Sequence, residues 1–178
     1  SQYFRFNDSK LRQSGIIEDY AVTISLFSGK KSLQSATTVS SDIKSSVNNL
    51  KNEIHALRNP LSLIPENEFT CFPDNFESIE MIKSGQLPDR NGILEALMDV
   101  ITKDYLTGVW TSGKIFRACF TSEGTNHWFE KDSFMFDFSL IDEKQNMVKV
   151  LFPGSSWDKD KFNTAFQEAS EKLKLMNK

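Results

Sequence analysis

The side chains best suited to metal chemistry are scarce in this sequence. It contains two histidines, His55 and His127, and two cysteines, Cys71 and Cys119. Neither histidine belongs to an H-E-x-x-H motif or to a pair spaced for one helix face, and the cysteines form no C-x-x-C pair. The sequence therefore predicts no metal site, and it predicts that both thiols are free and buried in a reducing cytoplasm.

Motifs for nucleophilic or nucleotide chemistry are also missing. The sequence has no G-x-S-x-G, and Gly108, Gly113 and Gly124 stand alone in turn contexts instead of forming a phosphate loop. Adjacent carboxylates such as Glu18 and Asp19 fit a solvated strand edge better than a general acid–base pair. We therefore expect no catalytic residue and no cofactor within this chain.

What remains is a concentration of turn and aromatic residues at 108–113 and 122–128. If the intervening strand joins these turns in a meander, Trp110, Arg117 and Trp128 border one concave sheet surface. An exposed sheet edge offers main-chain hydrogen bonds to an extended peptide, and alternate pockets accept its side chains. The alternative interpretation is that these residues fill the core and form tight turns.

Composition limits the class of protein that presents these residues. The chain has 178 residues, and its 21 basic and 24 acidic side chains give a net charge of −3. This balance gives no electrostatic reason to expect nucleic acid as a partner. No apolar run approaches the roughly 18 residues of a membrane helix. We expect a cytoplasmic protein without a membrane partner, and its 15 Phe require a sizeable core.

The first third of the sequence alternates as strands do. A short strand at 3–7 is followed by a turn at 7–10 and an extended piece through Arg12. Alternating runs at 20–26 and 31–39 flank a turn, which predicts a β-hairpin.

Three segments carry apolar residues at helical spacing, at 43–57, 93–101 and 162–176. Each is preceded by candidate N-caps: Ser40 or Ser41, Asp89 or Asn91, and Ser155 or Ser156. Pro60 is expected to end the first helix, and the second is expected to run to about Lys103.

The stretch between the first two helices is rich in proline. Residues 60–88 hold four of the five prolines together with Phe69, Phe72 and Phe76. We expect an ordered loop whose phenylalanines are anchored in the core, and a candidate domain junction near 60–90.

The second half again places strands before a helix. Strands are expected at 106–110 and 114–121 around a turn at Ser112-Gly113, and at 134–140 and 148–152, after which Pro153-Gly154 breaks the sheet. The sequence thus predicts one α+β domain over 1–178, with mostly antiparallel strands in two clusters and about three amphipathic helices.

Short stretches along nearly the whole chain form a series: FRFN at 4–7, RQSG at 12–15, LR at 57–58, LIPE at 63–66, GVWTSG at 108–113, Arg117, SEG at 122–124 and HW at 127–128. This series resembles the amino-terminal region of TldD/PmbA proteins, labelled modulators of DNA gyrase or peptide-maturation proteins. The better-understood members are zinc metallopeptidases that pair with a metal-free relative and cleave unfolded peptides.

The resemblance implies an amino-terminal, non-catalytic domain of a longer TldD/PmbA-like protein. The family's His-Glu-x-x-x-His zinc helix lies carboxy-terminal to the region matched here and is absent from this sequence. Either the catalytic half follows in the parent protein, with zinc there, or the parent belongs to the metal-free branch. In both cases this domain is expected to help form a peptide channel and a subunit interface, and to hydrolyse nothing alone.

The partners implied are an unfolded or extended peptide and a homologous subunit, in a homodimer or a heterodimer. The residues expected to line or anchor the peptide groove are Arg12, Trp110, Arg117, Glu123, His127 and Trp128. Two other interpretations stay open: an oligomerisation scaffold or metal-free partner subunit that binds no peptide itself, and a self-contained enzyme of unrecognised type.

Overall fold

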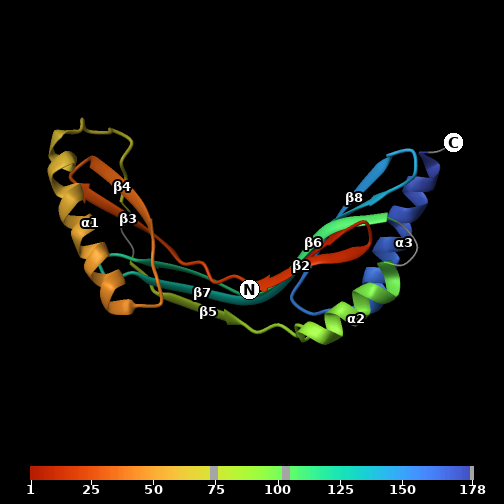
Figure 1. The fold of residues 1–178 in the computed structure, drawn as a ribbon. Helices are drawn as coiled ribbons and strands as arrows, with labels where there is room; N and C mark the ends of the chain where they lie inside the picture. Colours follow the sequence, from red (N-terminus) through yellow and green to blue (C-terminus); the bar gives the residue numbers. More distant parts are fainter. Residues whose placement is uncertain (73–75, 102–104, 177–178) are drawn as a thin grey trace. The chain divides into compact units, whose positions relative to one another are not determined.

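A computed structural model describes residues 1–72, 76–101 and 105–176. The chain divides into two compact units, Ser1–Ile17 with Glu77–Lys178, and Glu18–Phe76, which we call the larger and the smaller unit. The described residues form eight strands and three helices (Figure 1), and this confirms the α+β class. The boundary at 76 and 77 lies within the stretch 60–90 that the sequence suggests as a junction, and a second boundary follows Ile17.

A six-stranded sheet forms the larger unit. Its order is β2-β1-β6-β7-β5, with β8 also paired to β7, and only β5 runs parallel to its neighbour. The strands are β1 (Gln2–Asn7), β2 (Lys10–Ile16), β5 (Ile79–Lys83), β6 (Tyr105–Phe120), β7 (Asn126–Ile141) and β8 (Met147–Gly154).

One face of this sheet carries the core. Alternate residues of β7, from Phe134 to Leu140, are buried with residues of β1 and β6 against α2 (Arg90–Ile101) and α3 (Lys159–Leu175). Since successive side chains of a strand point to opposite faces, one parity of β7 supplies the core. The apolar stripe of α3 is buried from Phe162 to Leu173, as the spacing predicts, whereas Met176 is exposed at the end of the helix. The expected end of α2 near Lys103 lies outside the described residues.

Carboxylates, not hydroxyls, cap the helices. Asp89 Oδ1 accepts a hydrogen bond from Gly92 N at 2.7 Å, so Asp89, one of the two N-caps predicted for α2, is confirmed. The serine caps predicted for α3 are wrong, because Asp158 accepts from the amides of Asp160 and Lys161. Ser155 instead remains in sheet-like pairing, where its carbonyl accepts from Gln86 N. The serine caps predicted for α1 are also wrong, because its N-cap is Asp42.

The predicted turn at Ser112-Gly113 is wrong, because β6 runs through it without interruption. Ser112 pairs with Phe134 and Lys114 with Asp132 in one continuous register. Gly113 has φ 148°, and a Cβ there would lie 2.8 Å from the Cα of Ser1. A glycine is needed here because Ser1 approaches the backbone closely, not because the chain reverses direction. In the same way, β8 includes Pro153-Gly154 instead of ending before them.

The 60–88 stretch also differs from expectation. The prediction that Pro60 ends the first helix is wrong, because α1 (Ile43–Leu63) continues through it. A proline removes only one backbone hydrogen bond, and the buried Leu61 still anchors the last turn of the helix. Strand β5 lies in this stretch as well. The phenylalanines are not core anchors: Phe69 is 91% exposed, and Phe72 and Phe76 are exposed too.

The smaller unit consists of a hairpin and α1. The strands β3 (Ala21–Ser28) and β4 (Lys31–Thr38) pair around a two-residue loop in which Gly29 has φ 55°, so the predicted hairpin is confirmed. Helix α1 packs against both strands. Among the described hydrophobic residues of this unit, only Leu61 is buried.

Candidate functional site

Trp110 belongs to the core and does not line a groove. It is 0% exposed, its indole stacks on Phe134 with ring centroids 4.6 Å apart, and its Nε1 donates to Ser112 Oγ at 3.2 Å. Buried tryptophans usually satisfy the indole N–H in this way. The expectation that Trp110 forms a groove wall is therefore wrong, and the core-filling alternative holds for this residue.

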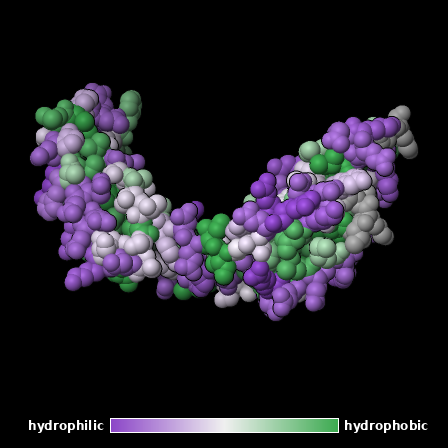
Figure 2. Space-filling model, in the orientation of Figure 1, coloured by the Kyte–Doolittle hydropathy of each residue, from purple (hydrophilic) through white to green (hydrophobic). Residues whose placement is uncertain are grey.

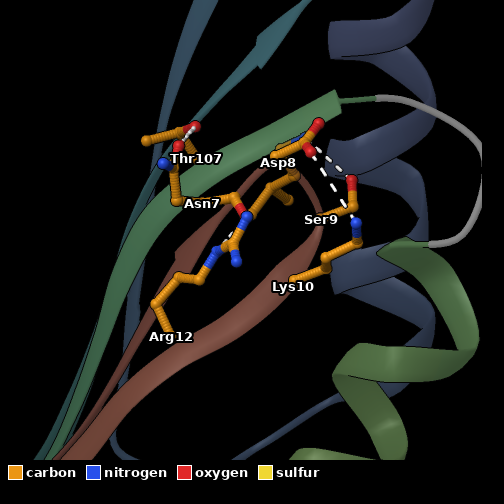
Figure 3. Close-up of polar contacts among 7 residues, drawn as sticks. Asn7, Asp8, Ser9, Lys10, Arg12 and Thr107 are labelled. Atoms are coloured by element: carbon orange, nitrogen blue, oxygen red, sulfur yellow. Dashed lines mark hydrogen bonds and ion pairs between the residues drawn. The ribbon is translucent and has the colours of Figure 1, made fainter.

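Arg12 supports the β1–β2 turn. Its Nε donates to the carbonyl of Asn7 at 3.2 Å (Figure 3). In the turn itself, Asp8 and Ser9 have φ 54° and 55°, and Ser9 N donates to Leu106 O on β6. Since β1 lies between β2 and β6, Arg12 is not brought next to the residues of the β6–β7 pair.

A shallow depression of about 420 Å³ lies beside this turn, lined in part by Asp8, Tyr105 and Asp142. The Asp142 carboxylate already accepts from the amides of Lys144 and Asn146 within its own turn. Within the described ranges, no group of three or more His, Cys, Asp or Glu could hold a metal ion. The depression thus offers no recognisable chemistry.

The other four candidates lie where β6 and β7 extend past the core. We call this part the arm: residues 114–120 of β6, the turn 121–125, residues 126–131 of β7, and β5. None of its described residues belongs to the core cluster under α2 and α3.

The two faces of the arm separate the candidates. Arg117 pairs with Phe129 and Cys119 with His127, whereas Ala118 pairs with Trp128. Opposite residues share a face and successive residues alternate, so Arg117 and His127 lie on one face and Trp128 on the other. The expectation that Trp110, Arg117 and Trp128 border one surface is wrong.

Trp128 has an aromatic neighbour on its own face of the arm. Its indole stacks on the Phe116 ring with centroids 5.4 Å apart and an angle of 7° between the planes. Both side chains are half-buried. Phe116 is not among the residues predicted to line the groove, although counting the strand register outward from the turn at 122–125 places it diagonally opposite Trp128.

Two charged side chains lie beside this aromatic pair. The Nζ of Lys114 contacts Glu130 Oε1, and this hydrogen bond raises the pKa of the Lys114 ammonium above its ordinary value.

Glu123, another of the predicted groove residues, lies exposed at the tip of the arm, and its carboxylate is 3.5 Å from Ser122 Oγ. The tip is therefore polar, whereas the middle of this face is aromatic.

Strand β5 forms one side of the arm. Ile79 pairs with His127, Glu80 with Trp128, and all five side chains of β5 are exposed. In the described part of the chain β5 has one strand neighbour, so its other edge is open. The sequence gives only a weak signal for this strand, because apolar residues at 79, 81 and 82 do not alternate.

The expectation of buried cysteines is wrong, since Cys71 and Cys119 are both exposed. Cys119 follows the arm's alternation and lies on the face of Arg117 and His127. Hydrophobic side chains also reach the surface of both units (Figure 2).

No family model, curated protein or solved structure matches this chain. Among the helices that the structure describes, none combines the length and apolar character needed to cross a membrane.

Proposed function

We propose that this chain is the amino-terminal, non-catalytic domain of a TldD/PmbA-like peptidase, and that it helps form the peptide-binding channel and the subunit interface. The motif series given above suggests the family. The observation that carries the peptide-binding part is the arm, a three-stranded extension in which the outer edge of β5 is open and a stacked aromatic pair lies on β6 and β7.

An extended peptide is the ligand that fits this arrangement best. The open edge of β5 offers unpaired main-chain groups, which a peptide strand satisfies without reading sequence. Trp128 lies one strand in from that edge and Phe116 two strands in, and together they offer an apolar surface to long side chains of the peptide. Binding of this kind suits unfolded substrates, because their backbone groups are free to pair.

Peptide binding can be measured on the 178-residue chain itself. The probe is a fluorescein-labelled insulin B chain, reduced and carboxymethylated so that it stays extended, followed by fluorescence anisotropy. Trp128→Ala should weaken binding about tenfold, a typical loss for an aromatic anchor. Phe69→Ala is the matched control, because it removes a fully solvated aromatic ring from the smaller unit. Equal affinity of wild type and Trp128→Ala would overturn the proposal.

A second candidate function, an oligomerisation scaffold without peptide binding, is favoured by one observation. The sheet face opposite α2 and α3 carries exposed apolar side chains, among them Val109, Met135 and Leu151. Size-exclusion chromatography with light scattering separates the two functions, since a dimer that fails to bind the peptide probe supports the scaffold.

A further inference from the structure

We propose that two copies of this chain pair through β3, with the two β3 strands antiparallel, so that two hairpins form one four-stranded sheet. The inference rests on the subunit-pairing part of the proposed function and assigns that pairing to a particular element. It is independent of peptide binding by the arm.

The hydrogen-bonding groups of β3 are available for such pairing. Ser28 and Lys31 close a two-residue loop, which makes them a hydrogen-bonded pair and sets the alternation along the hairpin. The bond from Val39 N to Tyr20 O at 2.9 Å follows the same alternation. The N–H and C=O groups of Ala21, Thr23, Ser25 and Phe27 therefore point away from β4. In the described residues, β3 pairs only with β4.

The edge of β3 also lacks the features that protect the edge strands β2 and β8 of the larger unit. Edge strand β2 has a register shift opposite Arg5 and Phe6 and carries Lys10 and Arg12, and β8 carries Lys149 and Pro153. Bulges, charges and prolines at edges disfavour the pairing of two folded edges. Residues 21–28 include no charge and no proline. Phe27 contacts the Phe72 ring, a side-chain contact that leaves the main-chain groups of β3 unpaired.

The charges at the two ends of β3 identify a second copy as the partner. Glu18 and Asp19 precede the strand and Lys30 and Lys31 follow it, and all but Lys31 are exposed. Lys31 Nζ donates to Ser62 O. No ion pair of Glu18, Asp19 or Lys30 occurs within the described residues. Antiparallel self-pairing places the acidic end of each copy beside the basic end of the other, whereas parallel pairing places like charges together.

One register satisfies both the charges and the backbone. With Ile24 opposite Ile24 of the second copy, Glu18 falls opposite Lys30 of the second copy. Thr23 then falls opposite Ser25 of the second copy, and both residues have outward N–H and C=O groups. The ladder gains about eight backbone hydrogen bonds, two for each hydrogen-bonded pair.

The same register fits the helices and the small core. Residues opposite each other keep the same face, so Val22 meets Leu26 of the second copy on the face that α1 covers. Two strands span about 9.6 Å, which matches the 8–10 Å at which helices pack, so two copies of α1 lie side by side on a four-stranded sheet. A two-stranded sheet is marginal alone, and the smaller unit exposes Ile43 and Val47.

Sedimentation equilibrium of the 178-residue chain tests the pairing. Wild type should form a dimer. Ser25→Pro removes an outward N–H and leaves the β3–β4 bonds intact, so the dimer dissociation constant should rise at least about tenfold. Gln34→Pro is the matched control, since Gln34 lies opposite Ser25 on the β4 edge with an equally outward N–H, and its dissociation constant should stay within about twofold of wild type.

A charge exchange tests the register without a proline. Glu18→Lys and Lys30→Glu should each weaken the dimer about fivefold, and the double variant should restore it, because both symmetric contacts are re-formed. A monomeric wild type, a dimer unaffected by Ser25→Pro, or a double variant weaker than either single variant would overturn the inference. The Ser25→Pro monomer should still bind the peptide probe. This measurement therefore distinguishes a failure of the β3 pairing from a failure of the arm as a peptide site.

Discussion

The indole of Trp110 stacks on the ring of Phe134, with the ring centroids 4.6 Å apart and the planes 13° from parallel. Trp157 closes the same cluster with edge contacts to both rings. These aromatic contacts lie on the buried face of the sheet, where β6 and β7 leave the core to form the arm. The arm therefore extends from an aromatic cluster in the core of the larger unit.

Trp110→Ala should lower the free energy of unfolding by about 3–5 kcal/mol, since it removes a fully buried indole and leaves a cavity. Trp128→Ala should lower it by less than about 1.5 kcal/mol, because this indole is only half-buried. Urea unfolding followed by circular dichroism measures both variants. Equal losses for the two variants would mean that Trp128 is a core residue and would remove the arm as a binding surface.

The cap of α3 should make stability depend on pH at the acid end. The backbone amide of Lys161 donates to the Asp158 carboxylate and, with the Lys161 side chain, lowers its pKa below the ordinary 3.8. The folded state therefore gains from ionised Asp158 above that value and loses the gain as the pH falls through the lowered pKa.

Asp158→Asn should melt a few degrees below wild type at neutral pH, and the difference should narrow as the pH falls through the lowered pKa of Asp158. Thermal melts over a series of pH values from neutral to acid check this, and Asp160→Asn is a neighbouring carboxylate control. A difference that stays constant across the acid range would show that Asp158 acts by something other than its charge.

Much of the fold could be predicted because its signals are local. Alternation in β7 and the stripe of α3 reflect which side chains face the core, alternation in β3 and β4 reflects which side chains are half-buried, and turn residues mark the β3–β4 hairpin. Strand β5 was missed because its existence depends on pairing with β7, about 48 residues away in sequence, as in Ile79 with His127. Gly113 was misassigned for a similar reason, since its environment is made by Ser1.

The candidate site was only partly predictable. Trp128 and His127 do lie on the arm, but residue type alone could not separate Trp128 from Trp110, because burial is decided by the helices that cover the sheet. The opposite faces of Arg117 and Trp128 follow from strand register, which becomes known only once β6 is seen to be continuous.

Amide hydrogen exchange of the 178-residue chain, with and without the carboxymethylated insulin B chain, tests the central claim most directly. The account predicts that bound peptide slows exchange at Ile79–Lys83, because its backbone pairs with the open edge of β5, while amides of α3 exchange at unchanged rates. Unchanged exchange along β5 at saturating peptide would contradict it.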